Sequence, residues 1–353
     1  MKGRQEVAKA ILLLSGGLDS TLAGKLLLEM GIEVEAVNFV SHFCRCTPQS
    51  FGCSAARRAA QQLGIDVRVF SCGEDYLEVV KHPRFGRGSG MNPCLDCRIY
   101  MFSRARTYML ARGADFVATG EVLGERPMSQ RRQAMEIIER ESGLAGLILR
   151  PLCAKLMSPT LPEREGIVDR DKLMEIRGRS RKPQIGLASK FGIRDYPCPA
   201  GGCLLNDPEF AARFRDLLEH EPDCEMDDAR LLRFGRHFRL PSGAKVIVGR
   251  NETENDSIER AARLGDTILV PLGVPGPSVL CLKASDAADI MTAAAFVAAY
   301  TKGGGKLDVE LRDGQKEKRV LEGVRPLDSA VAAQLWVGAA RPRTVFGHEV
   351  EQS

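Results

Sequence analysis

Long apolar runs are missing from this sequence of 353 residues. No stretch approaches the roughly 18–20 apolar residues that a membrane-spanning helix needs. No signal-peptide core precedes a small-residue cleavage site near the N-terminus. Histidine is also scarce, and the five histidines do not cluster, so none is a candidate catalytic residue. With 44% hydrophobic and 27% charged residues, the composition is typical of a soluble globular protein that is long enough for two domains. We expect a cytoplasmic protein with no membrane partner.

A strong net charge is likewise absent, because the formal value of +4 does not by itself indicate a nucleic-acid partner. Two stretches, residues 176–194 and 229–250, nevertheless each contain six basic residues and no acidic one. Such stretches suit an RNA backbone, since each neutralised phosphate releases counterions. A solvated basic face would explain one such stretch about equally well. The candidate RNA-binding residues are Arg179, Arg181, Lys182, Lys245 and Arg250.

A Walker A lysine is missing from the glycine-rich segment at residues 15–20, which reads Ser-Gly-Gly-Leu-Asp-Ser. Apolar residues 10–14 predict a buried strand before this segment, and the spacing over residues 21–30 predicts a helix after it. Glycines let backbone amides approach an anion, and a helix N-terminus favours negative charge. The segment therefore predicts phosphate binding but not γ-phosphate transfer. The alternative is an ordinary helix start with Asp19 and Ser20 as caps.

Strands and helices are predicted to alternate over residues 1–120, which is typical of a doubly wound parallel sheet. Further strands are expected at residues 34–40, 67–71 and 116–119, and helices at 54–63, 97–112, 129–141, 171–176, 184–191 and 210–219. Gly120 and Glu121 would lie at the carboxyl edge of this sheet, where ligands bind.

An acidic patch at residues 219–228 resembles a linker, and short strands and turns follow it. Strands are expected at residues 238–240, 245–248, 267–270, 279–282, 307–312 and 318–321, and helices at 254–264 and 286–300. We therefore expect an α/β protein with a doubly wound parallel sheet in residues 1–220 and a smaller C-terminal α/β domain in residues 229–353.

Eleven cysteines in a cytoplasmic chain argue against a disulfide framework and for metal, cluster or sulfur chemistry. Cys94 and Cys97 form a C-x-x-C pair before a predicted helix, a position that lowers thiol pKa values and suits metal binding or disulfide exchange. Zinc would need a second such pair at finger spacing, and none is present. Cys198 and Cys203 lie about a hundred residues further on. A separate group could bind zinc, relay sulfur or have no role: Cys44, Cys46 and Cys53.

Four segments together resemble the PP-loop tRNA thiouridine synthases, which belong to the N-type ATP pyrophosphatases: residues 15–20, 90–98, 119–130 and 201–205. The resemblance covers roughly residues 8–220. It implies a PP-loop (HUP-like) fold, with Asp19 holding Mg²⁺. It also implies that ATP is bound by Ser15, Gly16, Gly17, Asp19, Ser20, Gly120 and Glu121.

The same resemblance implies two possible routes for sulfur. In cluster-dependent members a C-x-x-C pair and one later cysteine hold a [4Fe–4S] cluster, so Cys94, Cys97 and Cys203 would be the ligands, with Cys198 as the substitute. In cluster-free members two cysteines serve as persulfide donor and resolving thiol. Either route implies ATP-dependent adenylation of a uridine carbonyl oxygen, then sulfur transfer and release of AMP. Asp19, Cys94, Cys97 and Cys203 would be the catalytic residues.

Residues 243–283 resemble the RNA-binding module of the NFACT proteins, which fits tRNA as substrate. The partners implied are tRNA and a sulfur donor, either sulfide or a cysteine desulfurase or relay protein, and a homodimer is possible. Three alternatives stay open at this point. They are a sulfur transferase for a small molecule, a PP-loop ligase that adenylates carboxylates, and an RNA-binding or cluster-carrying protein with a degenerate PP-loop.

Overall fold

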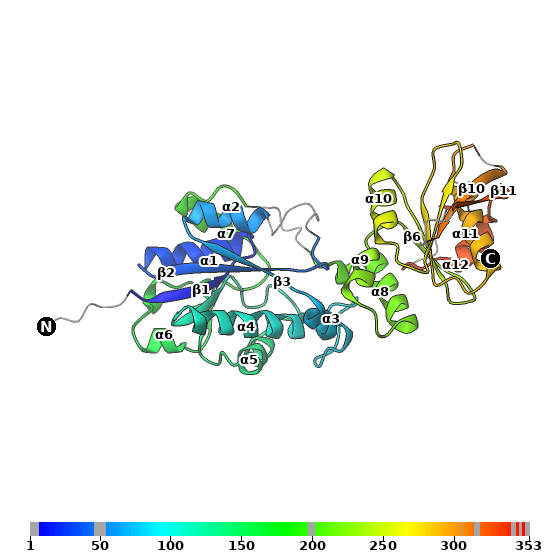
Figure 1. Cartoon of the computed structure of the whole chain (residues 1–353). Helices are drawn as coiled ribbons and strands as arrows, with labels where there is room; N and C mark the ends of the chain where they lie inside the picture. Colours follow the sequence, from blue (N-terminus) through cyan, green and yellow to red (C-terminus); the bar gives the residue numbers. More distant parts are fainter. Residues whose placement is uncertain are drawn as a thin grey trace. The chain divides into compact units, whose positions relative to one another are not determined.

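The computed structural model describes residues 7–45, 54–196, 202–303, 305–313, 318–339, 344–345 and 348–349. It divides into two compact units, Met1–Leu204 and Leu205–Ser353 (Figure 1). Helix α8 (Pro208–His220) lies in the second unit, although the sequence pattern groups it with the first domain. In the described part of the chain, no helix is both long and apolar enough to cross a membrane.

The first unit is built on a five-stranded sheet whose order is β3-β2-β1-β4-β5. All four neighbouring pairs are parallel, as predicted, so the doubly wound α/β fold is confirmed. The strands are β1 (Lys9–Leu13), β2 (Glu33–Val40), β3 (Val67–Ser71), β4 (Phe116–Thr119) and β5 (Ile148–Leu149). Parallel strands end at the same edge of a sheet, so the loops that follow them lie at one edge.

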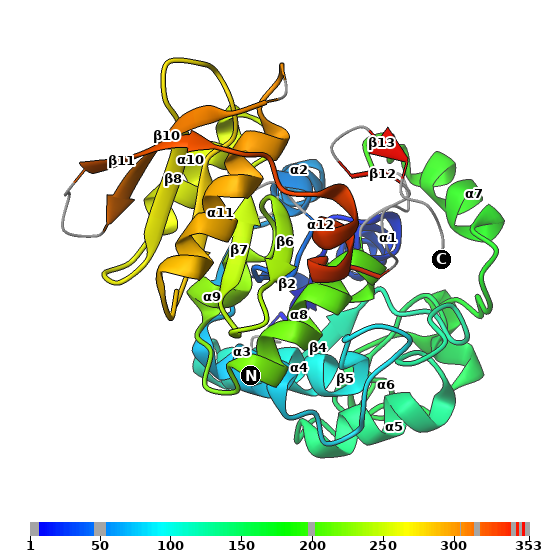
Figure 2. The same cartoon turned by 90° about the vertical axis from the view of Figure 1, so that its right-hand side faces the viewer.

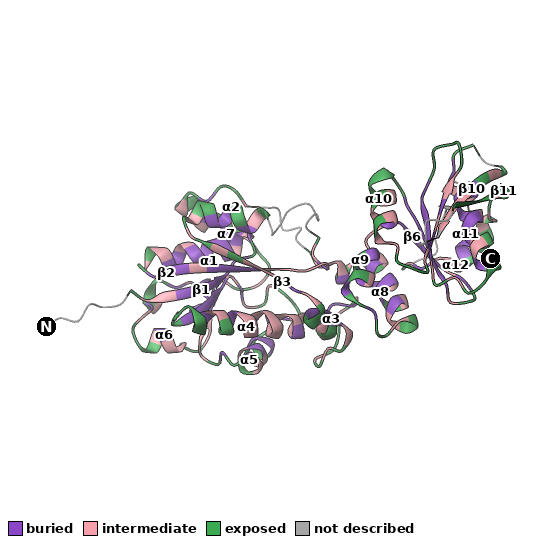
Figure 3. Ribbon diagram, in the orientation of Figure 1, coloured by how far each residue is buried: buried purple, intermediate pink, exposed green. Residues whose placement is uncertain are grey.

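Helices cover both faces of this sheet, because alternate residues of β1 point to opposite sides. Ala10 and Leu12 pack in one core with α1 (Leu18–Glu29) and α2 (Ser54–Leu63). Ile11 and Leu13 pack in the other with α4 (Cys94–Ala111) and α5 (Arg132–Glu141). Figure 3 shows β1 as largely buried. The other helices are α3 (Glu74–Lys81), α6 (Leu161–Arg164) and α7 (Lys182–Phe191), with 3₁₀ turns at Ala154–Leu156, Arg170–Lys172 and Leu204–Asn206.

Three predictions about helices are wrong. The C-x-x-C helix begins at Cys94 rather than at residue 97, so both thiols belong to its first turn. Residues 171–176 predict a helix, but only the 3₁₀ turn Arg170–Lys172 forms there, since Leu173 leaves helical geometry with ψ 162°. Helix α9 (Met226–Leu231) begins inside the acidic patch that was expected to be a linker, where a capping box at Glu225 and Asp228 starts it.

The second unit contains a six-stranded sheet of order β11-β10-β8-β9-β7-β6, in which all pairs are antiparallel. Its strands are β6 (Arg236–Arg239), β7 (Lys245–Val248), β8 (Thr267–Pro271), β9 (Val279–Leu282), β10 (Leu307–Asp313) and β11 (Lys318–Val324). Residues of α11 (Ala287–Tyr300) and α12 (Ser329–Leu335) share one core with the sheet (Figure 2). Residues of α9 and α10 (Glu252–Ala261) pack with Ile247 and Leu280 in another. A short pair, β12 (Thr344–Val345) and β13 (His348–Glu349), is separate.

A buried charge cluster fixes α8 against β6 and β7. Lys245 is 2% exposed, and its Nζ donates to Asp216 Oδ2 over 2.7 Å. Arg239 donates to both oxygens of the same carboxylate, at 2.7 and 3.1 Å. Lys245 was expected to contact RNA phosphates, and this expectation is wrong because its ammonium group is buried in an ion pair.

His237 lies beside this cluster and is fully buried. Burial, together with the positive charges of Lys245 and Arg213, holds the pKa of His237 well below its ordinary value of 6.5. Its Nε2 donates to the Phe234 carbonyl over 2.7 Å. As the pH falls below 6.5 the unfolded chain therefore binds a proton that the folded chain does not.

Acidification should consequently destabilise the second unit, and His237→Gln should remove the effect. Stability is fully present above pH 6.5 and should decline below it, by up to about 1.4 kcal/mol per pH unit. Urea titrations at several pH values can be followed by the fluorescence of Trp336, the only tryptophan of the chain, which contacts the neighbouring Phe238. Glutamine keeps an amide donor for the Phe234 carbonyl. Equal pH dependence in both proteins would contradict the assignment.

Candidate functional site: an anion-binding loop and a cysteine cluster at one sheet edge

The PP-loop segment, residues 15–20, leaves the carboxyl end of β1 and runs into α1. Gly120 and Glu121 leave the carboxyl end of β4, the strand that pairs with β1. From β1 the chain builds the sheet outward through β2 and β3, and then returns to the other side of β1 to form β4 and β5. Ligands of doubly wound sheets bind at such a reversal point.

Hydroxyl groups brace the loop from inside. Ser20 Oγ and Thr21 Oγ1 each donate to the Gly17 carbonyl over 3.0 Å. Ser15 Oγ lies 3.1 Å from Ser20 Oγ and accepts from the Gly17 N–H at 3.3 Å. No side chain caps α1, because Gly17 occupies the N-cap position. The alternative prediction of Asp19 and Ser20 as caps is therefore wrong, and the helix N-terminus carries no capping side chain.

Two glycines permit the close packing around this loop. Gly16 has φ +80°, and a Cβ there would come within 2.3 Å of the Ala55 carbonyl carbon at the start of α2. A Cβ on Gly120 would come within 2.4 Å of the Asp19 carbonyl carbon and the Ser20 nitrogen. Any larger residue would have to displace backbone. Gly120 therefore lets the loops after β1 and β4 pack together, and Gly16 lets the PP-loop pack against α2.

Asp19 is a largely buried carboxylate in the PP-loop segment. Burial raises its pKa, while Arg181, Gln184 and Arg126 act in the opposite direction. Its Oδ1 is buried and has no hydrogen-bond partner among the described residues. Burial and the charge of Asp19 likewise raise the pKa of Glu125. The site therefore holds two carboxylates whose ionised forms are under-stabilised, which is an environment that fits a bound cation.

Glu121 is engaged in a different way. Its side chain is 1% exposed, and Oε2 accepts from Arg150 Nε over 3.1 Å. Arg98, which follows Cys97 in α4, lies 3.4 Å from Oε1, and Arg150 also contacts Glu139. These contacts make Glu121 a link between the end of β4 and the C-x-x-C helix. Its predicted contact with ATP stays a prediction.

The two thiols of the C-x-x-C pair each accept a hydrogen bond from a buried polar side chain. Asn92 Nδ2 donates to Cys94 Sγ over 3.1 Å, and the Tyr76 hydroxyl donates to Cys97 Sγ over 3.1 Å. The pKa of Cys97 is raised, because the effect of burial outweighs the hydrogen bond from Tyr76, which acts in the opposite direction. Neither Asn92 nor Tyr76 is a site residue predicted from the sequence. Asn92 precedes Cys94 by two residues in the sequence, whereas only closeness in space to Cys97 indicates a role for Tyr76.

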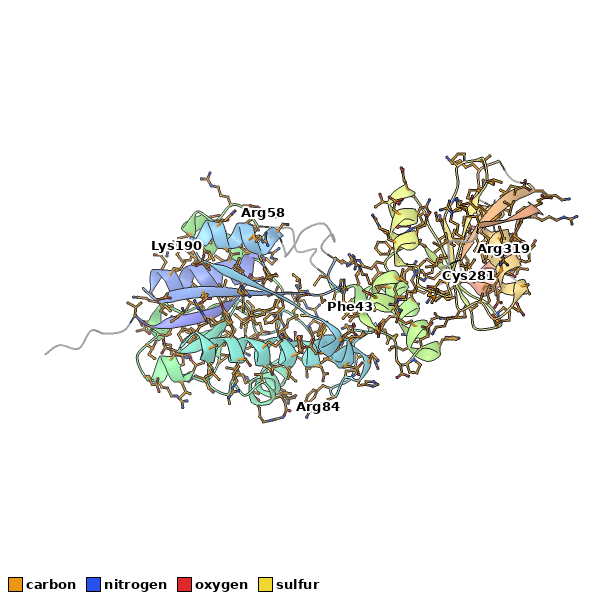
Figure 4. The ribbon with its side chains drawn as sticks, in the orientation of Figure 1. Phe43, Arg58, Arg84, Lys190, Cys281 and Arg319 are labelled. Atoms are coloured by element: carbon orange, nitrogen blue, oxygen red, sulfur yellow. The ribbon has the colours of Figure 1, made fainter. Side chains whose placement is uncertain are left out.

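Cys203 lies opposite Cys44 in an isolated antiparallel bridge. The Leu204 N–H donates to the Phe43 carbonyl over 2.7 Å, and the Arg45 N–H donates to the Gly202 carbonyl over 3.3 Å. Phe43, labelled in Figure 4, is 1% exposed and anchors this turn in the core. The sequence pattern groups Cys44 with Cys46 and Cys53, away from Cys203, so the bridge is a finding of the tertiary structure. Cys46, Cys53 and Cys198 lie outside the described residues.

Five thiols lie near one another at this sheet edge, and they are Cys44, Cys72, Cys94, Cys97 and Cys203. Burial and the neighbouring Cys97 and Cys44 raise the pKa of Cys72 to about 12. The charges of Cys94 and Cys44 contribute to raising the pKa of Cys97, and the charge of Cys203 contributes to raising the pKa of Tyr76. Cys44 and Cys72 follow the carboxyl ends of β2 and β3, so the cluster lies at the same sheet edge as the PP-loop.

The structure does not test the iron–sulfur ligands that the resemblance implies. Among the described residues, which include Cys94, Cys97 and Cys203, no three His, Cys, Asp or Glu side chains are grouped as metal ligands. The Tyr76 hydroxyl is hydrogen-bonded to Cys97 Sγ, one of the three sulfurs that the resemblance implies. The predicted ligand set therefore stays a prediction.

The predicted RNA-binding residues fall into three groups. Arg179 and Lys182 are exposed. Both lie near Arg181, whose positive charge favours the ionised form of Asp19. Arg250 is 44% exposed, but it is ion-paired with Glu254 through several hydrogen bonds. Lys245 is buried, as described above. Basic surface next to the PP-loop edge is thus supplied by residues 177–182.

Two separate parts of this chain resemble known protein families. Residues 8–140 match the family model described as the tRNA methyl transferase HUP domain, and residues 235–337 match the NFACT protein RNA binding domain. The first match lies within the first unit and the second match within the second unit. Each covers less than half of the chain.

Three known proteins illustrate the similarity. The tRNA-specific 2-thiouridylase MnmA of Sulfurimonas denitrificans is 36% identical over 33% of this chain and 35% of its own length. The MnmA of Streptomyces griseus is 28% identical over 66% of this chain and 63% of its own. The U34-tRNA thiolase NcsA of Methanococcus maripaludis, solved with its [4Fe–4S] cluster, is 20% identical over 64% of this chain and 70% of that one, with a TM-score of 0.31. The chain thus spans about a third to two thirds of the two MnmA proteins.

Gly120→Ala should loosen the PP-loop without touching a cysteine. The added methyl group would overlap the backbone of Asp19 and Ser20 and should cost about 1–3 kcal/mol as overpacking does. Hydrogen exchange followed by mass spectrometry should show faster exchange in peptides that cover the first turn of α1. Gly186→Ala is the matched control, since a Cβ there meets no atom within 4 Å. Equal exchange in the two variants would contradict the steric argument.

Proposed function

We propose that this protein is an ATP-dependent tRNA sulfurtransferase. It would adenylate a uridine carbonyl oxygen and then transfer sulfur to the activated carbon, with release of AMP. One observation carries the proposal: an anion-binding loop and five described thiols, Cys44, Cys72, Cys94, Cys97 and Cys203, lie at the same edge of one parallel sheet. A nucleotide and a sulfur nucleophile must meet in this way for the reaction.

The activation step needs an enzyme because a carbonyl oxygen is a poor leaving group. Transfer of AMP to that oxygen makes a good leaving group, and pyrophosphate can be held by backbone amides at a helix N-terminus. Residues 15–20 supply these amides, and Ser15 and Ser20 supply hydroxyls beside them. The exposed residues Arg179 and Lys182 would neutralise phosphates of tRNA near the same edge.

Mg²⁺ fits this site, because Asp19 Oδ1 is buried without a hydrogen-bond partner among the residues that the structure describes and the pKa of Asp19 is raised by burial. Asp19 would hold the ion, with Glu125 nearby, and the ion would neutralise charge on the ATP phosphates. What the chain itself contributes is position: Gly120 lets the loops after β1 and β4 pack together, and Gly16 lets the PP-loop pack against α2.

For the sulfur step we propose a persulfide on Cys203 as the nucleophile. Its terminal sulfur would attack the adenylated carbon and displace AMP. The sulfur donor, whether sulfide or a desulfurase or relay protein, stays a prediction, as do the [4Fe–4S] route and a homodimer. An iron count after anaerobic reconstitution with iron and sulfide tests the cluster route directly.

Two variants should separate the half-reactions. Asp19→Asn should lower tRNA-dependent pyrophosphate release by about a hundredfold or more, since the cation would lose its ligand. Cys203→Ala should still release pyrophosphate but form no thiouridine, measured by mass spectrometry of digested tRNA. Pyrophosphate release without any need for tRNA would favour a small-molecule substrate. Wild-type thiolation by Cys203→Ala would refute the persulfide assignment.

The double variant Arg179→Glu and Lys182→Glu should weaken tRNA binding and reduce its salt dependence. Each lost phosphate contact lowers the slope of log affinity against log salt by about 0.7–0.9. Lys172→Glu is the control, because Lys172 lies in the same region but is paired with Asp169. Filter binding at several salt concentrations measures both slopes. An unchanged slope in the double variant would place the tRNA elsewhere.

A further inference from the structure

Cys44 has no role in the reaction proposed above, yet the fold places it directly opposite Cys203. The two backbone hydrogen bonds of this bridge join the residues that flank the cysteines, Arg45 to Gly202 and Leu204 to Phe43. Cys44 and Cys203 therefore form a non-hydrogen-bonded antiparallel pair. In such pairs the Cα atoms lie about 4.5 Å apart and the side chains are close. A disulfide needs Cα atoms about 4.4–6.8 Å apart, so the backbone can accept one here.

The turn before the bridge orients the Cys44 sulfur. The Cys44 N–H donates to the Ser41 carbonyl over 3.0 Å, and the Ser41 N–H donates to Cys44 Sγ over 3.4 Å. Phe43 holds the turn in the core, where its ring lies 6.1 Å from that of Tyr76. Cys94 and Cys97 instead belong to the first turn of α4, and each sulfur accepts a hydrogen bond from Asn92 or Tyr76. Of these thiols, Cys44 is the one in strand register with Cys203.

We propose that Cys44 is the resolving thiol of the sulfur-transfer step and that it acts by forming a Cys44–Cys203 disulfide. This role rests on the proposed thiolation. Attack by the Cys203 persulfide on the adenylated carbon leaves the nucleotide joined to Cys203 through a disulfide. The Cys44 thiolate then attacks Cys203 Sγ, and the bond between Cys203 and the transferred sulfur breaks.

The electrons balance without an unnamed reactant. The electron pair of the broken bond stays on the transferred sulfur, which becomes the thiocarbonyl of the product. The transferred sulfur gains two electrons, and the two cysteines lose two when their disulfide forms. A thiol reductant restores both thiols before the next turnover.

The first test needs no tRNA. The full-length protein is equilibrated in glutathione buffers of increasing oxidised fraction, alkylated, digested with trypsin and analysed without reduction. Arg45 lets trypsin separate residues 26–45, with Cys44 as their only cysteine, from Cys46 and Cys53. We expect this peptide to be linked to residues 195–213, which contain Cys203. Because Cys198 shares that peptide, the link must persist in Cys198→Ala.

Controls make this test decisive. The link should vanish in Cys44→Ala and Cys44→Ser and remain in Cys224→Ala, a substitution in the second unit. Linkage of residues 195–213 only to residues 88–98, which contain Cys94 and Cys97, would overturn the pairing. Absence of any link to residues 26–45 across the whole redox range would also overturn it.

The second test is a single turnover of persulfide-loaded protein with ATP and tRNA, without reductant. In the wild type we expect the Cys44–Cys203 disulfide to appear in equal amount to thiouridine. In Cys44→Ala, pyrophosphate release should persist, free thiouridine should fall about tenfold or more, and tRNA should stay bound to the protein until dithiothreitol is added.

The two tests distinguish the two possible failures. If Cys44→Ala releases thiouridine at the wild-type rate, another thiol resolves the intermediate and the proposal is wrong. If the wild type forms no thiouridine although the disulfide forms in the first test, the proposed thiolation fails and the resolving role with it, while the pairing of the two thiols still holds.

Discussion

Parallel pairing of β1 with β2 on one side and with β4 on the other is the constraint on which the first unit depends. It buries β1 on both faces, so that Ala10 and Leu12 serve one helix layer while Ile11 and Leu13 serve the other. It also sends the loops after β1, β2, β3 and β4 to the same edge of the sheet. Segments far apart in the sequence thereby become neighbours without any specific bond between them.

This edge brings together two kinds of chemistry. On the PP-loop side, backbone amides and the under-stabilised carboxylate of Asp19 suit polyphosphate and a cation. On the other side, polar groups donate to thiol sulfurs, as Tyr76 does to Cys97 and Asn92 to Cys94. Glu121 and Arg98 connect the two sides, because an ion pair links the end of β4 to the C-x-x-C helix. A change in the loop after β4 can therefore alter the position of the C-x-x-C helix, and a change in that helix can alter the loop.

Charge in the second unit shows how tertiary contacts alter what a sequence suggests. The basic stretch at residues 229–250 has the composition of an RNA-binding surface. Two of its cations, Arg239 and Lys245, instead form ion pairs with Asp216 of α8, and Arg250 forms an ion pair with Glu254. Counting basic residues thus overstates the charge that the surface offers to a phosphate backbone.

Local pattern determined much of this protein. Alternating apolar runs gave the parallel sheet and most strand boundaries, since β3, β4, β7 and β9 begin and end where the pattern predicts. The glycine-rich loop was likewise recognisable, because its conformation is set by residues adjacent in sequence. Tertiary structure alone decided which side chains are neighbours. The sequence separates Cys44 from Cys203, and only the bridge between their backbones makes them a pair. The sequence also predicts that Lys245 is a surface cation, and only the packing of α8 buries this side chain. The physical reason is that the contacts of a side chain depend on which distant segment the fold places against it.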